Sequence, residues 1–170
     1  MEYRKGYGRA YKTGFKNASG EIIVTTDADL TYPTEKIDVF IRYFNCNNLD
    51  FLSTNRFWKY DRFAWSPINI VGNKLLTTLI NFLFLMRLKD SQSGMWIFKK
   101  DILDKLTLEE DGMAFSTEIK ISTHLHRFKL GEIPIHYRKR PTGSKSKLSW
   151  FRDGLNILNF IIRKRLLSLF

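Results

Sequence analysis

The chain has 170 residues, enough for one domain with a hydrophobic core, and its 44% hydrophobic and 26% charged residues exclude a disordered chain. Lysines and arginines number 28 against 17 acidic residues, and the net charge of +11 favours anionic partners: phosphorylated substrates, an acidic membrane surface or nucleic acid. Cys46 is the single cysteine of the sequence, which excludes an intramolecular disulfide and favours a reducing compartment. Three histidines without suitable partners do not indicate a zinc site.

The first third of the chain alternates between helix and strand patterns. Residues 8–18 carry small side chains four positions apart, Gly14 among them, which is typical of a helix packed closely on a flat surface. A short apolar strand is expected at 22–25, then a helix opened by Pro33, then a second strand at 49–54. This alternation predicts an α/β fold with a mostly parallel sheet and flanking helices.

The middle of the chain begins with an aromatic and basic segment, 56–65, which is predicted to be a loop. Ser66 and Pro67 are expected to cap a long helix. The polar residues of that helix favour a buried or interfacial position over a membrane span. The next expected elements are a polar loop at 90–94, an apolar run at 95–98, a helix that Ser116 caps and that runs to about Arg127, and an edge strand around Pro134.

The last segment, 149–170, is predicted to be an amphipathic basic helix. Its polar stripe contains Arg152 and Arg163, and its apolar stripe contains Phe151 and Leu155. Such a helix is suited to a membrane interface or a partner, and packing on the core is an equally good interpretation. We therefore divide the chain into a domain at 1–148 and an interfacial helix at 149–170.

Two carboxylates, Asp27 and Asp29, directly follow the first expected strand. Open α/β sheets bind ligands beyond the carboxyl ends of their strands. Hard oxygen ligands suit Mg²⁺ or Mn²⁺, which can neutralise the charge of a departing diphosphate. An Asp-x-Asp sequence taken alone is more often a solvated loop, so the residues leave both interpretations open.

Four blocks of sequence, in order, resemble family 2 glycosyltransferases with the GT-A fold, above all those that load a sugar onto dolichyl or undecaprenyl phosphate. The blocks are Gly6 to Pro33, Ser53 to Arg56, Asp90 to Gly94 with the Trp96 and Phe98 that follow, and Glu132 to Leu148. The resemblance implies a partial GT-A, Rossmann-like domain that lacks the first nucleotide-binding βα units. It also implies metal-dependent, inverting transfer from a nucleotide-sugar donor to a polyprenyl or dolichyl phosphate.

The resemblance also implies roles for individual residues. Those expected to act are Asp27 and Asp29 on the metal and donor diphosphate, Asp90 as a catalytic or sugar-contacting carboxylate, Arg56 at a phosphate, and Arg138 or Arg140 with Ser146 and Lys147 in a loop that closes on phosphate. Asp90 has the alternative role of capping its own loop, and the 138–147 segment that of a solvated basic loop. Glu118, at a helix start, is expected to serve the helix dipole rather than a sugar.

We expect the chain to work in the cytoplasm, peripherally at the membrane surface, with a nucleotide-diphosphate sugar, a lipid phosphate and a second copy of itself as partners. The family's base-binding strands precede the matched blocks, so this chain alone is expected to be poorly stable and inactive. Two alternatives stay open. One is a non-catalytic remnant that docks on a membrane or a complete homologue. The other is a basic module for nucleic acid, for which the sequence has no motif.

Overall fold

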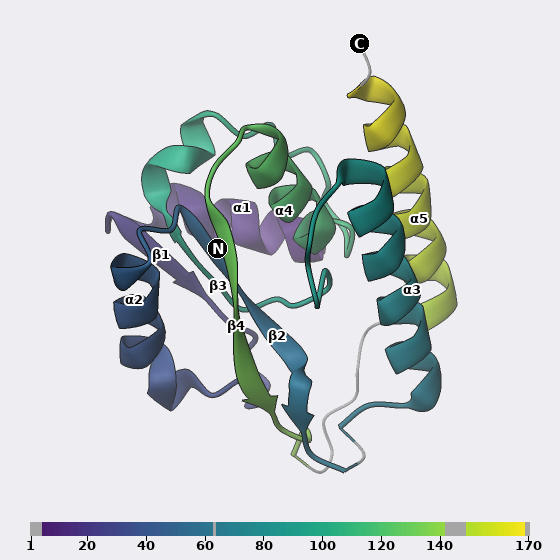
Figure 1. Cartoon of the computed structure of the whole chain (residues 1–170), viewed down its shortest axis with the longest axis horizontal. Coiled ribbons are helices and arrows are strands. Elements are labelled where there is room, and N and C mark those ends of the chain that lie inside the picture. Colours follow the sequence, from purple (N-terminus) through teal and green to yellow (C-terminus); the bar gives the residue numbers. More distant parts are fainter. Residues whose placement is uncertain (1–4, 63, 142–148, 169–170) are drawn as a thin grey trace.

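The computed structural model of the chain describes residues 5–62, 64–141 and 149–168. A four-stranded sheet lies at its centre, with helices packed around it (Figure 1). In chain order the elements are α1 (Tyr7–Asn17), β1 (Ile22–Thr25), the 3-10 helix η1 (Thr34–Lys36), α2 (Ile37–Cys46), β2 (Phe51–Tyr60), α3 (Pro67–Phe84), β3 (Trp96–Lys99), the 3-10 helix η2 (Lys100–Asp104), α4 (Phe115–Leu125), β4 (Leu130–Tyr137) and α5 (Trp150–Leu167).

The sheet has the strand order β1-β3-β2-β4. The α/β class is confirmed, but the expectation of a mostly parallel sheet needs correction. Among the described strands, only β2 and β4 pair in parallel, because β3 lies between β1 and β2 and is antiparallel to both. The chain enters β3 at Trp96, opposite Thr25 at the carboxyl end of β1, so β3 must run back along its neighbours. Its amino end therefore lies where β1 leaves the sheet.

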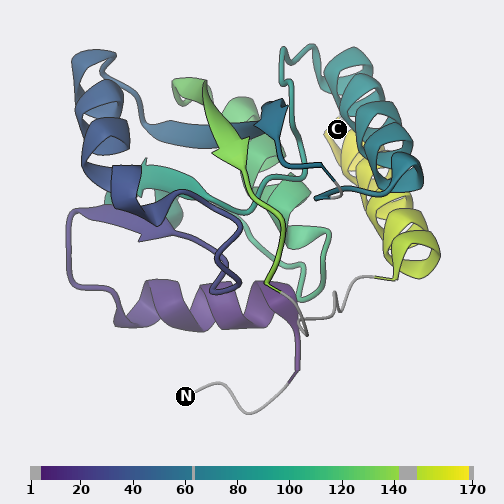
Figure 2. The same cartoon turned by 90° about the horizontal axis from the view of Figure 1, so that it is seen from below.

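The two faces of the sheet have separate hydrophobic cores, because alternate strand residues point to opposite sides. On one face, Leu52 and Ile97 pack with Phe40 and Phe44 of α2. On the other face, buried aromatic side chains of β2, β3, α1 and α4 pack together: Phe51, Trp96, Phe98, Phe15 and Phe115. Figure 2 shows α2 and the α3–α5 pair on opposite sides of the sheet.

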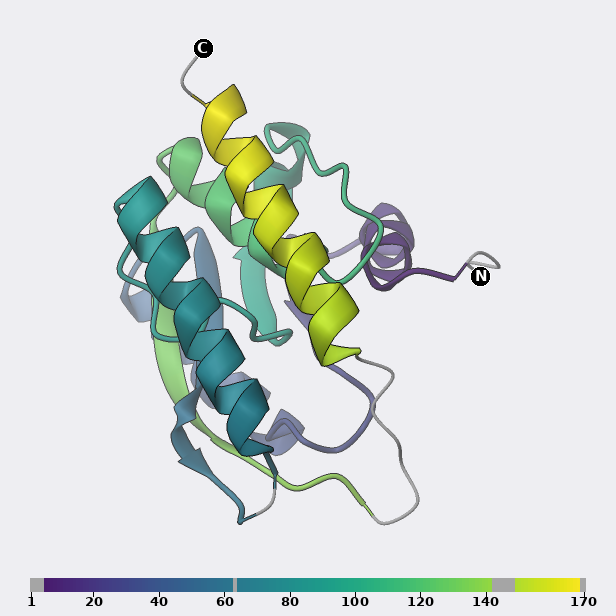
Figure 3. The ribbon, with the colours of Figure 1, turned by 90° about the vertical axis from the view of Figure 1, so that its right-hand side faces the viewer.

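The helices α3 and α5 lie side by side on one flank of the molecule (Figure 3). The predicted carboxy-terminal helix is confirmed, and it packs through Ile157, Phe160 and Ile161 against the side chains of α3 and α4. The predicted apolar stripe around Phe151 and Leu155 stays on the outside. The helix thus has two apolar stripes, and only one of them contributes to the core. Within the described residues, no helix combines the length and apolarity needed to cross a membrane.

Several local expectations change. β2 continues to Tyr60, so half of the predicted aromatic loop is a strand paired with β4 beyond an irregularity after Asn55. The cap of α3 is confirmed, because the Ser66 hydroxyl accepts the N–H of Asn69. The cap predicted at Ser116 is wrong, since α4 already begins at Phe115. The edge position of the strand around Pro134 is confirmed, because β4 ends the sheet of described strands.

The sequence predicts close helix packing at Gly14, but it occurs at Gly8, six residues earlier. A Cβ built on Gly8 would lie 2.3 Å from the carbonyl oxygen of Glu110, whereas one on Gly14 would have no atom within 4 Å. Gly8 therefore sets the approach of α1 to the loop before α4.

Candidate active site

The two predicted metal ligands lie in a tight turn just after β1. The hydroxyl and the backbone N–H of Thr31 both donate to Asp29 Oδ1, at 2.6 and 3.2 Å. Between them, Leu30 has φ 62°, a left-handed conformation that is uncommon outside glycine. A carboxylate that accepts from the residue two positions on is a recognised way to hold such a turn. Asp29 is therefore fixed in orientation, with its Oδ2 facing outward to a side-chain partner.

Asp27 lies deeper than Asp29 and has fewer partners. The Tyr11 hydroxyl of α1 donates to its Oδ1 at 3.3 Å. Burial raises the pKa of Asp27, and the neighbouring charge of Asp29 raises it further, because a second negative charge is unfavourable there. Burial also acts to raise the pKa of Asp29, but hydrogen bonds from Thr31 and Arg140 outweigh it and leave that pKa below its usual value. Asp29 therefore ionises at a lower pH than Asp27.

The structure separates the two predicted arginines. Arg140 Nε donates to Asp29 Oδ2 at 2.6 Å, so this side chain lies at the end of β1 with the carboxylates. Arg138 forms an ion pair with Glu35 instead, and its backbone N–H donates to the carbonyl of Thr31 at 2.9 Å. The predicted phosphate-binding residues Ser146 and Lys147 lie outside the described residues.

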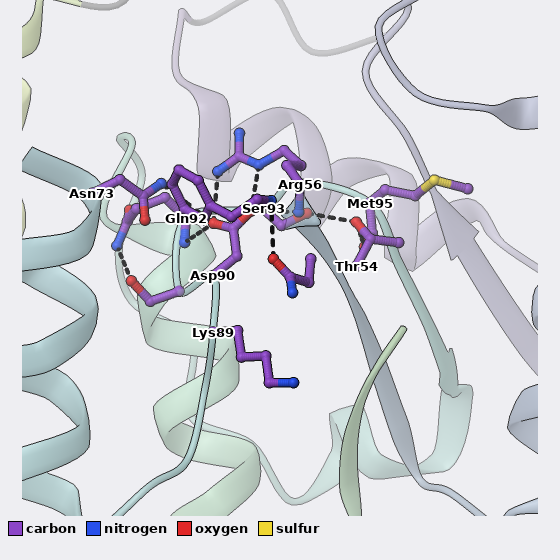
Figure 4. A network of polar contacts seen from close by, with 12 residues as sticks. Thr54, Arg56, Asn73, Lys89, Asp90, Gln92, Ser93 and Met95 are labelled. Carbon is purple, nitrogen blue, oxygen red and sulfur yellow. Dashed lines mark hydrogen bonds and ion pairs between the residues drawn. The ribbon is translucent and has the colours of Figure 1, made fainter. Parts of the chain in front are cut away.

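A second carboxylate–arginine pair, Asp90 and Arg56, lies inside the molecule (Figure 4). The guanidinium donates from Nε to Asp90 Oδ2 at 2.6 Å and from Nη2 to Oδ1 at 2.8 Å, a bidentate arrangement. Backbone N–H groups of Arg56 and Gln92 and the side-chain amide of Asn73 complete the shell at 3.1, 3.2 and 3.3 Å. The Asp90 side chain has no exposed surface. Both of its oxygens are occupied.

The guanidinium of Arg56 also lies against aromatic rings. Its carbon is 4.6 Å from the ring centre of Trp65 and 5.4 Å from that of Tyr137. Burial raises the pKa of Asp90, but the charge and hydrogen bonds of Arg56 outweigh it, and the pKa is below its usual value. Asp90 and Arg56 are therefore both charged. The Arg56 guanidinium is held by Asp90 and lies against the rings of Trp65 and Tyr137.

The loop at 90–94 connects this buried pair to Asp27. The hydroxyls of Ser93 and Thr54 are 2.6 Å apart, and the Gly94 carbonyl accepts from Tyr11 at 3.1 Å. A Cβ on Gly94 would lie 2.7 Å from the Tyr7 hydroxyl and 3.3 Å from Asp27 Oδ2. A side chain at position 94 would displace the Tyr7 hydroxyl, so the loop that starts at Asp90 packs closely against Asp27 at its other end.

Other groups at the site were not predicted. Tyr7 and Tyr11 are one helical turn apart on α1, a spacing that indicated a shared face but not its contact with Asp27. Lys120 is buried behind the 90–94 loop, and nothing in its sequence context distinguishes it from a surface lysine. Glu118, in the first turn of α4 as expected, accepts the N–H groups of residues 109 and 110, so its carboxylate holds the preceding loop.

The residues at the end of β1 fit a divalent cation with phosphate ligands. Within the part of the chain that the structure describes, no three His, Cys, Asp or Glu side chains are grouped as a metal site. Asp27 and Asp29 are thus the two available carboxylates, and Mg²⁺ in particular is commonly held by one or two carboxylates with water and substrate phosphate. Burial and, after it, the neighbouring charge of Asp29 raise the pKa of Asp27, and a cation beside it would favour its ionised form.

The comparisons with known proteins agree with the fold and the motifs. The model of Glycosyl transferase family 2 matches residues 1–107. Low-salt glycan biosynthesis hexosyltransferase Agl6 of Haloferax volcanii is 28% identical over 93% of this chain, and Dolichyl-phosphate hexose transferase of the same organism is 28% identical over 94%. Dolichol-phosphate mannosyltransferase of Pyrococcus furiosus is 29% identical over 85%. The chain spans 38%, 68% and 41% of these three proteins.

Solved structures show the same architecture. Glucosyl-3-phosphoglycerate synthase from Mycobacterium tuberculosis in complex with UDP superposes with a TM-score of 0.69 at 15% identity, over 97% of this chain and 57% of that one. The complex of that enzyme with Mn²⁺, UDP and glucosyl-3-phosphoglycerate gives 0.63 at 18% identity, over 99% and 55%. At this identity the likeness shows the fold, and the expected GT-A-like architecture is confirmed. With the family model matching well over half of its length, the chain belongs to glycosyl transferase family 2.

Proposed function

We propose that this chain carries the catalytic part of an inverting hexosyltransferase, which moves a sugar from a nucleotide-diphosphate donor to the phosphate of a dolichyl or other polyprenyl lipid. The 90–94 loop carries the proposal, because it begins at Asp90, which holds the Arg56 guanidinium, and ends at Gly94, which packs against Asp27. The names of two relatives, a dolichyl-phosphate hexose transferase and a dolichol-phosphate mannosyltransferase, support the lipid phosphate as acceptor.

On the donor side, Asp27 and Asp29 would hold Mg²⁺ or Mn²⁺. When bound, the cation neutralises negative charge that develops on the diphosphate leaving group. Arg140, which contacts Asp29, would be able to donate to phosphate oxygens if Asp29 held the cation. Ser146 and Lys147, on the segment after Arg140, are proposed as further phosphate ligands, and Arg138 as the residue that anchors this segment through Glu35.

On the acceptor side, no general base is required. A phosphate monoester has a second pKa of about 6 and is already largely ionised at neutral pH. One of its oxygens attacks the anomeric carbon, a new carbon–oxygen bond forms as the bond to the diphosphate breaks, and the configuration inverts. Because both oxygens of Asp90 are occupied, we assign it the role of orienting Arg56 for phosphate rather than that of removing a proton.

The flank formed by α3 and α5 supports a membrane surface as the place of reaction. α3 buries the polar side chains Asn73 and Thr77 toward the 90–94 loop, together with the apolar Ile80 and Phe84, and it exposes large apolar side chains on its other face. Its exposed apolar residues are Ile68, Val71, Leu75 and Phe82, and Leu85, directly after the helix, is exposed as well. The inner face of α3 therefore contacts Asp90 while its outer face is suited to lipid.

α5 extends the same surface. Its exposed apolar stripe, Phe151, Leu155, Ile162 and Leu166, is accompanied by the exposed cations Arg152 and Arg163. Apolar side chains with flanking arginines are typical of helices that lie in the headgroup region of an acidic membrane. Docking of this flank would bring lipid phosphates to the side of the molecule that holds Arg56.

The test uses the purified full chain with vesicles that contain dolichyl phosphate, a panel of labelled UDP- and GDP-sugars, and Mn²⁺ or Mg²⁺. We expect a metal-dependent lipid-linked sugar at a low rate, because the sequence predicts an incomplete nucleotide site. Asp29→Ala abolishes this product, and Asp38→Ala, at an exposed carboxylate of α2, leaves it unchanged. Vesicle binding without transfer and without metal-dependent binding of UDP would overturn the proposal and favour a non-catalytic membrane-docking protein.

A further inference from the structure

Lys120 of α4 is fully buried, although it does not contact a carboxylate. Its ammonium group donates to the carbonyl oxygens of Ser91 and Ser93, at 2.8 and 2.7 Å, and lies 5.5 Å from the ring centre of Trp96. Within the described residues, neither a hydrogen bond nor an ion pair joins it to an acidic side chain. Burying an ammonium group in this way is costly, so its retention requires a reason.

The loop that Lys120 contacts has no strand partner for its backbone, and side chains take that place. Glu132 accepts the N–H groups of Lys89 and Asp90, at 2.6 and 3.0 Å, and Thr77 accepts that of Ser91 at 3.1 Å. Lys120 supplies the donors for the carbonyl groups on the other side of the loop. The carboxyl group of Glu132 thus holds the start of the loop, and the ammonium group of Lys120 holds its centre.

We propose that Lys120 is a positioning residue for Arg56: by fixing the carbonyl groups of Ser91 and Ser93, it fixes the Asp90 carboxylate that orients the guanidinium. The inference extends the proposed function. It rests on that function only for the identity of the ligand of Arg56, a phosphate group. If the ammonium group is removed, the Ser93 carbonyl keeps the Trp96 indole N–H, which donates to it at 2.6 Å, but the Ser91 carbonyl loses the donation from Lys120 and the loop relaxes. Small displacements of a positioned group cost large factors in rate, so the effect on transfer should exceed that on stability.

The charge of Lys120 offers a way to observe this coupling. Burial lowers the pKa of Lys120 to about 7, against the opposing influence of Asp90, while Arg56 lowers it and Glu132 raises it. These are the ionisable groups that face it from the loop, β2 and β4. Below that pH the ammonium makes charge-assisted hydrogen bonds to the loop, and above it the neutral amine makes weaker ones. Glu132 is itself buried with a raised pKa, so a variant at Lys120 is needed to separate the two.

The experiment measures hydrogen exchange of the Arg56 Nε–H group in the ¹⁵N-labelled full chain by NMR. Lys120→Met keeps an unbranched side chain, shorter by the terminal nitrogen, and removes the donor, and Lys105→Met, at an exposed lysine outside the loop, is the matched control. We expect Lys120→Met to keep the backbone spectrum of the folded chain and to accelerate Arg56 exchange at least about tenfold, with no change in the control. Unchanged Arg56 exchange in a folded Lys120→Met chain would overturn the inference.

A measurement on the unsubstituted chain covers the case in which Lys120→Met does not fold. Between about pH 6 and pH 8, the Lys120 and Arg56 side-chain resonances should titrate with a common midpoint near 7. An Arg56 resonance that stays constant while the Lys120 resonance titrates would also overturn the inference. Neither readout needs donor or acceptor. Failed sugar transfer with intact Lys120–Arg56 coupling would therefore count against the proposed function alone, and active transfer without coupling against Lys120 alone.

Discussion

The two carboxylate–arginine pairs of this molecule have the same contact distance and different surroundings. Arg56 with Asp90 and Arg140 with Asp29 each place Nε 2.6 Å from Oδ2. The side chains of the first pair are 9% and 0% exposed, and those of the second are 33% and 18% exposed. Asp90 receives a bidentate guanidinium and three further donors, whereas Asp29 receives a single guanidinium contact and the groups of its own turn.

The difference in burial and in the number of hydrogen-bond donors indicates different roles for the two pairs. A buried, fully paired charge is difficult to separate from its partner, because separation leaves an unpaired charge in a medium that solvates it poorly. A partly exposed pair exchanges its partner at little cost, because water and ions compensate. We infer that Arg56–Asp90 is a fixed part of the scaffold, and that Asp29 is a ligand that releases Arg140 when a cation and diphosphate arrive.

The largest expected effect is that of Asp90→Asn. The substitution leaves the buried Arg56 guanidinium without its counter-charge, and we expect a loss of about 3–5 kcal/mol in the free energy of unfolding. Asp29→Asn, the matched change at the open pair, should cost about 1 kcal/mol or less. Urea denaturation followed by circular dichroism measures both. Equal losses in the free energy of unfolding at the two sites would mean that burial does not distinguish the contributions of the two pairs to stability.

Gly94→Ala should have the next largest effect, because it disturbs the packing of the 90–94 loop against Asp27. The added methyl would lie 2.7 Å from the Tyr7 hydroxyl and 3.3 Å from Asp27 Oδ2, and we expect a loss of about 1–3 kcal/mol from overpacking, together with weaker metal binding. Gly14→Ala has free space around the new methyl and should instead stabilise α1 by about 0.5–1 kcal/mol. Effects of the same sign at both glycines would refute the close contact.

Asp27→Asn should have a small stabilising effect at neutral pH and abolish metal binding. The pKa of Asp27 is raised in the folded chain above its ordinary 3.8, so ionised Asp27 reduces stability at pH values above the raised pKa. The unsubstituted chain regains this stability as the pH falls through that pKa, so the advantage of the variant should shrink on acidification. Urea midpoints at neutral and mildly acidic pH test the sign. A variant less stable than the parent at neutral pH would contradict it.

The sequence predicted the ends of strands better than their directions. Asp27 and Asp29 follow an apolar run, and ligand sites follow buried strands in α/β sheets, so their place was predictable. The reversal of β3 was not, because residues 95–98 have the same apolar pattern in either direction. That reversal brings Asp90 to Arg56, 34 positions away in the chain. Both residues were predicted as site residues, but their pairing depends on the strand order.

Two alternatives that the sequence left open have the same origin, in patterns that two packings satisfy equally. The stripe of α5 that contains Phe151 and the one that contains Phe160 are both apolar, and contact with α3 and α4 selects the second for the core. Arg138 and Arg140 are equally basic, and it is Arg138 that forms an ion pair with Glu35 of η1. Each choice is made by a residue distant in the sequence.

The exchange of partners at Asp29 can be followed directly through the two guanidinium Nε–H resonances of the ¹⁵N-labelled chain while Mg²⁺ and UDP are added together. We expect the Arg140 resonance to shift and its exchange with water to accelerate as Asp29 turns to the cation, while the Arg56 resonance keeps its position and protection. An Arg140 resonance unchanged at millimolar Mg²⁺ and UDP, or an Arg56 resonance that moves with it, would contradict the assignment of one exchangeable and one fixed pair.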